Sequence, residues 1–236
     1  HITGGNNYIA LFLPKKKTIV TVHDLDHYLL TLKGLKKKIY GVIWFKLPLT
    51  NTGKIVCISS LTKIKLIKYF KISDDNISVI HNCYHSRFKR LHSVNKENNS
   101  ILQIGTKKNK NLDRVIGAIR NLNYKLKIIG SLSKQQESCL KENQIEYTNL
   151  VALKPEEVVN EYNKASLVIF ASTSEGFGLP ILEAQVTETP VITSNLEPMK
   201  SVLGHNLSLV DPYSSNNIKN MIKKVLSDKD FAAKVV

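Results

Sequence analysis

Short runs of β-branched and apolar residues alternate with amphipathic stretches along nearly the whole chain, and this alternation is the strongest constraint on the fold. It is typical of parallel sheets covered by helices, because two parallel strands must be joined by a crossover. Lysine interrupts every apolar run before it reaches the roughly 18 residues that a membrane-spanning helix needs. The sequence therefore predicts a globular α/β protein without a membrane span.

The predicted elements form two groups. The first has strands at 18–22, 54–58 and 77–80 and a helix at 60–70. The second has strands at 101–104, 126–129, 145–148, 167–170, 191–193 and 207–210, and helices at 112–121, 134–142, 156–164, from about 180 and from about 216. Residues 82–100 are polar and without periodicity, which marks a connection. We expect two Rossmann-like, doubly wound domains, residues 1–95 and 96–236.

The first group has too few β-α units for a complete doubly wound sheet. The chain also begins at His1, without an initiator Met or a secretory signal. We therefore expect a fragment of a longer protein whose first domain is truncated.

The charge of the chain is strongly positive, with 34 Lys+Arg against 19 Asp+Glu, a net charge of +15. Two lysine clusters stand out, Lys15–Lys17 and Lys36–Lys38. Nucleic acid is not the expected partner, because the basic residues are mostly lysine and no aromatic residues are interleaved with them. An anionic membrane surface and an ordinary solvated surface both stay open. Three widely spaced cysteines indicate neither disulfides nor zinc, so we expect a reducing, cytoplasmic setting.

The segment Ser172–Thr193, STSEGFGLPILEAQVTETPVIT, carries the most specific motif. Its glycines let the backbone approach a ligand, and Pro180 suits the first turn of a helix. The N-terminus of such a helix favours phosphate or pyrophosphate. Glu175 and Glu183 are separated by seven residues, so one carboxylate can reach the distal part of a ligand. The other, expected in the first helical turn, can accept two hydroxyl hydrogen bonds, as from a ribose.

With these features together, the segment resembles the E-x7-E motif, EGFGLPxLEA, of the GT-B glycosyltransferases of glycosyltransferase family 4. The segment Ile101–Leu112, ILQIGTKKNKNL, is similar to the same family's strand and loop that end in a basic residue followed by Asn-Leu. The resemblance implies that Lys110 binds the donor pyrophosphate, where a fixed cation can replace a metal. Asn109 stands where Arg is common, so one charge is missing or is supplied by Arg114 or Lys108.

A third similar segment is Lys17–Tyr28, KTIVTVHDLDHY, a predicted strand ending in His23. The resemblance implies that His23 faces the donor sugar and orients the reacting centre. The helix start at Ser59 and the segment Ile77–Asn82 are also similar to the family, although Cys83 follows where Gly is usual.

The resemblance implies a GT-B fold with two Rossmann-like domains facing a cleft. It implies retaining transfer of a hexose-type sugar from a nucleotide diphosphate sugar. The Lys-rich face suggests that the acceptor is a glycan or lipid-linked glycan at the inner face of the membrane, as in surface polysaccharide synthesis. No metal or other cofactor is expected, since the nucleotide sugar is a substrate. The expected catalytic residues are His23 and Glu175, and the expected donor-binding residues are Gly105, Thr106, Lys110, Glu175, Gly176, Phe177, Gly178, Leu179 and Glu183.

Other interpretations stay open. The chain could be a catalytically incomplete module that binds a nucleotide sugar or a polyanion, or a nucleotide-sugar epimerase or sugar-phosphate synthase of the same fold. Asp24-Leu25-Asp26 has the D-x-D form that binds a metal in GT-A enzymes, but such tripeptides are common. His23 with His27, and His81 with His85, have the spacing of zinc ligands on a helix but lack a third ligand nearby.

Overall fold

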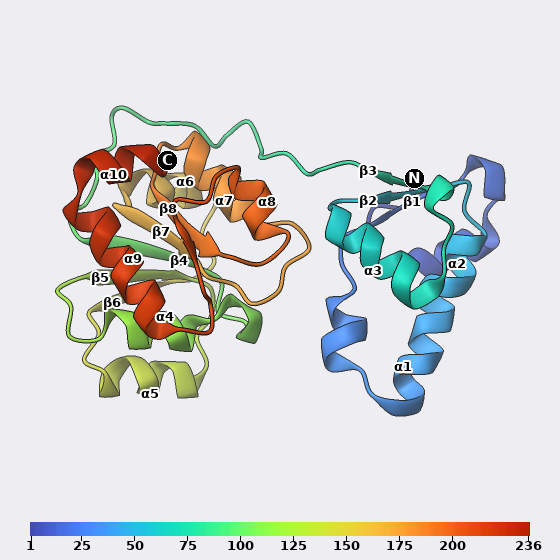
Figure 1. The fold of residues 1–236 in the computed structure, drawn as a ribbon, viewed down its shortest axis with the longest axis horizontal. Helices are drawn as coiled ribbons and strands as arrows, with labels where there is room; N and C mark the ends of the chain where they lie inside the picture. The colour runs from blue at the N-terminus through green and yellow to red at the C-terminus, as the bar shows by residue number, and fades with distance from the viewer. The chain divides into compact units, whose positions relative to one another are not determined.

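The computed structural model describes residues His1–Val236, which divide into two compact units (Figure 1). Unit 1 comprises His1–Asn82 with Glu175–Phe177, and unit 2 comprises Cys83–Ser174 with Gly178–Val236. Each unit has its own parallel sheet and its own apolar core. Every helix is too short or too polar to cross a lipid bilayer.

Unit 1 is built on a three-stranded parallel sheet in the order β1-β2-β3, formed by β1 (Ile19–Val22), β2 (Lys54–Cys57) and β3 (Ile77–Val79). Helix α3 (Ser60–Phe70) connects β2 to β3. The Ser59 hydroxyl caps it by accepting a hydrogen bond from the backbone N–H of Thr62. The apolar core of unit 1 includes Val20, Val22, Ile55, Cys57, Leu66 and Phe70.

The chain between β1 and β2 is largely helical, which the sequence did not predict. It contains the π-helical turn η3 (His27–Thr31), then α1 (Gly34–Tyr40), the π-helical η4 (Gly41–Lys46) and α2 (Leu47–Thr50) without interruption. Apolar residues lie on the exposed side of this run as well as on the buried side, so no single apolar face reveals the helical period. The 3-10 turns are η1 (Asn7–Phe12), η2 (Lys15–Lys17) and η5 (Asp74–Asn76).

Unit 2 is built on a six-stranded parallel sheet in the order β6-β5-β4-β7-β8-β9, which is the 3-2-1-4-5-6 order of a Rossmann fold. Its strands are β4 (Ser100–Ile104), β5 (Lys125–Ile129), β6 (Tyr147–Leu150), β7 (Leu167–Phe170), β8 (Val191–Ser194) and β9 (Leu209–Val210). Its helices are the 3-10 turn η6 (Lys108–Lys110), α4 (Leu112–Ile119), α5 (Lys134–Glu142), α6 (Pro155–Lys164), α7 (Leu179–Val186), α8 (Met199–Leu203), α9 (Ser215–Ser227) and α10 (Lys229–Lys234).

Two apolar clusters cover the two faces of this sheet. One gathers side chains from α4, α5, α9 and α10, and the other gathers side chains from α6, α7 and α8. Consecutive β4 residues Ile101 and Leu102 belong to opposite clusters, as the alternation along a strand requires. The prediction of an α/β, doubly wound unit is confirmed for this part of the chain.

A buried ion-pair network also holds unit 2 together. The Lys127 ammonium on β5 lies 2.7 Å from a Glu97 carboxylate oxygen and 2.8 Å from one of Glu161. Glu161 also contacts Lys164 at 3.1 Å. Burial alone would lower the pKa of Lys127, but the hydrogen bonds that its ammonium donates to Glu161 and Glu97 raise it. Burial alone would raise the pKa of Glu161, but the hydrogen bonds from Lys127 and Lys164 lower it.

Candidate functional site

The topological switch point of unit 2 lies between β4 and β7, the two central strands. From β4 the chain proceeds to β5 on one side, whereas β7 leads to β8 on the other. Loops at the carboxyl ends of such strands diverge and leave a crevice, where ligands bind in open α/β sheets. The two loops here are residues 105–111 and residues 171–178. Of the residues predicted from the sequence to bind the donor, Gly105, Thr106 and Lys110 lie on the first loop and Gly178 on the second, whereas Leu179 and Glu183 lie on α7. Glu175, Gly176 and Phe177 belong to unit 1.

Lys110 crosses back over the start of its own loop. Gly105 has a φ of +85°, and a Cβ atom there would lie 2.9 Å from Cγ of Lys110. Only glycine fits, for both its backbone angle and its lack of a side chain. The buried amide of Gln103 donates to the Gly105 and Lys110 carbonyls at 3.3 and 3.0 Å. The Lys110 ammonium lies 4.7 Å from the centroid of the Phe170 ring, so it is held at the end of β7.

Asn109 braces the two loops against each other. Its side-chain amide donates to the Ser174 carbonyl at 2.9 Å, and its own carbonyl accepts from the backbone N–H of Thr173 at 2.8 Å. Asn109, which stands where Arg is expected, thus links the two loops through its short side chain. The longer side chain of an arginine could not make the same short link.

Asn111 is a second bracing residue, and sequence reasoning gave it no role beyond the motif. It adopts the left-handed conformation with φ +64°, and its buried amide donates to the carbonyls of Ala171 and Pro212 at 2.9 and 2.7 Å. Arg114 donates to the Asn111 side-chain oxygen at 2.9 Å and lies over the Tyr213 ring. Asn adopts the left-handed conformation more readily than most residues, so an Asn directly before a predicted helix was the sequence feature that could have indicated this role.

Thr106 joins the loop after β4 to the loop after β5. Its hydroxyl donates to the Ser131 carbonyl at 2.6 Å, and its carbonyl accepts from the Gln136 side chain at 2.8 Å. These two hydrogen bonds fix the loop after β4 against the loop after β5.

Helix α7 begins where the motif predicts. Gly178 has a φ of +120°, which L side chains rarely adopt, and Pro180 lies in the first turn. Glu175, Gly176 and Phe177 occupy the connection between β7 and α7. The expectation that Glu183 lies in the first helical turn is wrong, since α7 starts at Leu179 and its first turn holds no acidic residue. The helix begins directly after the glycine, so Glu183 is one turn further along.

Glu183 lies half-buried and is held by a residue that sequence reasoning missed. The Tyr162 hydroxyl on α6 donates to its Oε2 at 2.6 Å. Burial raises the pKa of the Glu183 carboxyl, while the Tyr162 hydrogen bond and the positive charge of Lys110 act to lower it, and the net change is upward. Lys110 therefore lies near enough to Glu183 to act on its charge. The switch point brings together a cation and a carboxylate, the two groups needed for a diphosphate and a diol.

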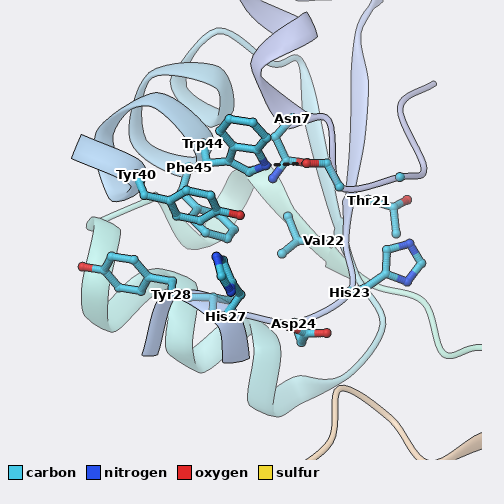
Figure 2. A pocket seen from close by; sticks show the side chains of 13 residues that line it. Asn7, Thr21, Val22, His23, Asp24, His27, Tyr28, Tyr40, Trp44 and Phe45 are labelled. Carbon is cyan, nitrogen blue, oxygen red and sulfur yellow. Dashed lines mark hydrogen bonds between the residues drawn. The ribbon is translucent and has the colours of Figure 1, made fainter. Parts of the chain in front are cut away.

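In unit 1, His23 follows β1 directly and lines a cavity of about 170 Å³ together with Asp24 (Figure 2). Its Nε2 lies 2.5 Å from the Thr3 carbonyl oxygen. The backbone carbonyl of His23 accepts from the Thr62 hydroxyl at 3.3 Å, so the capped start of α3 also fixes the end of β1. The structure thus places His23 at a pocket, at the strand end that the sequence predicted.

Aromatic rings form one wall of this cavity. Tyr40 and Trp44 stack with centroids 5.0 Å apart and planes 12° apart, and His27 meets the edge of Tyr40 at 5.3 Å. The Trp44 indole N–H donates to the Gly5 carbonyl, the dashed line in Figure 2. Burial and the nearby Asp24 charge raise the pKa of Tyr40. Rings beside a carboxylate and imidazoles suit a small ligand with an apolar face and hydroxyl groups.

The carboxylates of the Asp24-Leu25-Asp26 triplet have local partners. Asp24 Oδ1 accepts from the backbone N–H of Asp26 at 2.9 Å, and Lys65 lies 3.4 Å from Asp26 Oδ1. No group of three or more His, Cys, Asp or Glu side chains is arranged to hold a metal ion.

Two Rossmann-like units, the second with the 3-2-1-4-5-6 sheet, define a protein of the GT-B class. The sequence profile described as "Glycosyl transferases group 1" matches residues 86–236, and the profile "Glycosyltransferase Family 4" matches residues 1–87. The chain belongs to the group 1 glycosyltransferases, and the family predicted from its motifs is confirmed.

Relatives agree with this assignment. The uncharacterized glycosyltransferase MJ1178 of Methanocaldococcus jannaschii is 27% identical over 217 residues, which are 90% of this chain and 59% of that protein. The O-antigen chain mannosyltransferase RfbU of Salmonella typhimurium is 25% identical over 87% of this chain and 60% of its own length. HepE of Anabaena, solved with UDP and glucose, superimposes with a TM-score of 0.79 at 16% identity, over 92% of this chain and 64% of that one. This chain thus spans about 60% of the length of these curated relatives.

Proposed function

We propose that the chain is part of a retaining glycosyltransferase that moves a hexose-type sugar from a nucleotide diphosphate sugar to a glycan or lipid-linked acceptor. The observation that carries this proposal is that the Lys110 ammonium, held over the Phe170 ring at the end of β7, acts electrostatically on the Glu183 carboxylate of α7 at the switch point of unit 2. Two similar proteins support its chemistry, since RfbU is named as an O-antigen mannosyltransferase and HepE was solved with UDP and glucose. Surface polysaccharide synthesis is the proposed setting.

In the proposed mechanism, residues 96–236 bind the donor and residues 1–95 bind the acceptor. Lys110 and the start of α7 after Gly178 hold the diphosphate, and Glu183 accepts hydrogen bonds from the ribose. As the bond to the sugar breaks, negative charge grows on the leaving diphosphate, and the fixed cation stabilises it without reorganisation. Glu175 contacts the sugar, and His23 orients it.

The Glu183→Ala variant tests the donor site. It removes the acceptor of two ribose hydroxyls, so the binding free energy of the nucleoside diphosphate should weaken by about 1 to 3 kcal/mol. The dissociation constant should therefore rise roughly 5- to 150-fold. The control is Glu142→Ala, an exposed carboxylate on α5. An unchanged dissociation constant in the first variant refutes the role of Glu183. Donor binding without any sugar transfer would favour a catalytically incomplete binding module instead.

The cavity beside His23 is the proposed acceptor site. A pyranose presents a face of C–H groups to an aromatic wall such as Tyr40 and its hydroxyls to imidazole and carboxylate groups. We expect His27→Ala, at the exposed edge of this cavity, to raise KM for the acceptor while leaving donor affinity unchanged. A donor affinity that falls in parallel would assign the cavity to the donor.

A lipid surface is the proposed location of the acceptor, and one face of unit 1 supports it. On the helical run Gly34–Thr50, five apolar side chains at helical spacing are between 42% and 72% exposed: Leu35, Ile39, Val42, Ile43 and Leu47. Lys36, Lys38 and Lys46 are exposed on the same run. Unit 1 has no Asp or Glu between Asp26 and Asp74 to neutralise them. This basic-apolar stripe, the eight residues just named, matches an interfacial helix on anionic lipid.

Vesicle co-sedimentation tests the stripe, with phosphatidylcholine vesicles that contain or lack phosphatidylglycerol. The triple variant Lys36→Gln, Lys38→Gln, Lys46→Gln should bind the anionic vesicles on the order of a hundredfold more weakly, since each lysine contributes about a factor of five near acidic lipid. The matched control replaces three exposed lysines of unit 2, Lys200, Lys223 and Lys229, by Gln. Binding that ignores phosphatidylglycerol, or that falls equally in the control, refutes the proposal. Self-association that is lost in Ile39→Ser with Ile43→Ser would assign the stripe to a second copy of the chain.

A further inference from the structure

The Glu183 carboxylate, proposed to bind the sugar donor, is hydrogen-bonded to a tyrosine in the core of unit 2. Tyr162 is on α6 and is 0% exposed, and its hydroxyl donates to Oε2 of Glu183 on α7 at 2.6 Å. Both helices lie on the same face of the sheet. A short bond from a neutral hydroxyl to a carboxylate is among the stronger hydrogen bonds in proteins, because one partner is charged.

The Tyr162 side chain has little freedom to move. Its ring packs in an apolar cluster with Leu102, Val168 and Ala184. Phe88 meets it at right angles, with ring centroids 5.5 Å apart and an interplanar angle of 89°. A tightly packed aromatic ring holds its hydroxyl oxygen in one place.

The Tyr162 backbone is also tied. Its carbonyl oxygen accepts from the Thr189 hydroxyl at 2.8 Å, and that hydroxyl lies 2.5 Å from the Lys96 ammonium. Thr189 lies beyond the end of α7, just before β8. The segment that follows the Glu183 helix is therefore bonded to the same residue that holds the Glu183 carboxylate.

The geometry leaves the other half of the carboxylate available to a ligand. A carboxylate has about four acceptor positions on its two oxygens, and Tyr162 uses one position on Oε2. With that oxygen fixed from the core side, Oε1 and the second position of Oε2 lie in a set orientation. Two adjacent hydroxyl groups need two acceptor positions at a fixed spacing.

We propose that Tyr162 is a positioning residue of the donor site: its hydroxyl fixes the Glu183 carboxylate in the orientation that accepts the two ribose hydroxyls of a nucleoside diphosphate. This inference rests on the ribose-binding role proposed for Glu183. Preorganisation of this kind lowers the entropy that the ligand must remove from a binding side chain.

The charged and titratable groups that act on Glu183 are Tyr162 and Lys110. Both lower the pKa of the carboxyl against the effect of burial, so loss of the tyrosine hydroxyl should raise that pKa. A tyrosine that only packs against Glu183 would give no such change in the variant. The titration therefore tests the hydrogen bond itself, and the dependence of nucleotide binding on that bond tests the positioning role.

The first experiment is a carbon NMR titration of the Glu183 carboxyl, without nucleotide, in the wild type, Tyr162→Phe and the control Tyr147→Phe on the edge strand β6. Phenylalanine keeps the ring and its packing and removes only the hydroxyl. We expect the midpoint to move to higher pH in Tyr162→Phe and to stay in place in the control. An unmoved midpoint in Tyr162→Phe overturns the proposal.

The second experiment is a double-mutant cycle on the dissociation constants of a panel of nucleoside diphosphates. Tyr162→Phe should weaken binding about tenfold in the wild-type background, as expected for one hydrogen bond to a charged group, and should have no further effect in Glu183→Ala. Equal penalties in both backgrounds, or none in the wild type, overturn the positioning role while Glu183→Ala alone still reports on the donor site. If the wild type binds none of the nucleotides, it is the proposed function that fails.

Discussion

The two units of this chain handle charge in opposite ways. Residues 1–82 contain 13 lysines, no arginine and four aspartates, a net charge of +9. Residues 83–236 contain 21 basic and 15 acidic residues, a net charge of +6 over nearly twice the length. Unit 2 buries some of its charges, in the Lys127 network and beside Glu183. Unit 1 instead exposes Lys36, Lys38 and Lys46 next to exposed apolar side chains.

The difference shows that a donor site and a lipid-binding surface place different demands on the sequence. A donor site needs charges fixed in position, and fixed charges require burial, hydrogen bonds and particular residues at particular loops. A surface that binds lipid or a variable acceptor needs only a sign of charge and exposed apolar area. The comparison therefore predicts large, localised effects of substitutions in unit 2 and small, additive effects of substitutions on the surface of unit 1.

The largest expected effect is that of Lys127→Met. This change leaves the Glu161 and Glu97 carboxylates without their shared cation, so the free energy of unfolding should fall by about 3 to 5 kcal/mol. The matched control is Lys125→Met on the same strand, whose pair with Glu146 is exposed and should contribute at most about 1 kcal/mol. Urea denaturation of both variants measures the difference. Equal losses of unfolding free energy in the two variants would show that the buried network stabilises the fold no more than the exposed pair does.

The same network makes stability depend on acid. The pKa of Glu161 is lowered in the folded state, so its contribution to stability is present above the ordinary carboxyl pKa and is lost as the pH falls through the folded value. Wild-type stability should therefore fall more steeply than that of Glu161→Gln when the pH is lowered from 5 to 3, a window set by the ordinary carboxyl pKa of about 4.3. Parallel pH profiles for the two proteins would contradict this expectation.

A partly buried lysine, Lys96, sharpens the comparison, because it has no carboxylate pair like those of Lys127. Burial lowers the pKa of Lys96 to about 8, and its ammonium contacts the Thr189 hydroxyl. Between that value and the unfolded pKa of about 10.5, the unfolded state binds more protons, so wild-type stability should rise with pH in this window. Lys96→Met should lack this rise and should not lower stability at pH 7. A loss as large as that of Lys127→Met would be inconsistent with a burial penalty at Lys96.

The smallest expected effect concerns the stripe of unit 1. Replacing Lys36, Lys38 and Lys46 by Gln should change the free energy of unfolding by less than about 0.5 kcal/mol, because exposed side chains without partners contribute little. Nucleotide affinity should also be unchanged. A clear loss of stability would mean that these lysines have a structural use within unit 1.

The sequence predicted the elements of unit 2 well because their signals are local. The capping box at Ser133, the apolar strand Leu167–Phe170 and the Gly-Pro start of α7 set their own boundaries, and α5 and β7 have the predicted limits. The helices between His27 and Thr50 were missed because apolar residues occupy both faces of the run. The roles of Asn109 and Tyr162 depend on partners more than 20 residues away, which no local pattern contains.

The most direct test of the account is a thermal-shift panel of nucleoside diphosphates and nucleotide sugars, with and without EDTA, on the wild type and on Lys110→Ala. Ligand that binds the folded state stabilises it by about 2.7 kcal/mol at a hundredfold excess over the dissociation constant. We expect a base-selective rise in Tm that is unaffected by EDTA and is lost in Lys110→Ala. A rise that persists in the variant, or no rise with any nucleotide, would contradict a donor site at the switch point of unit 2.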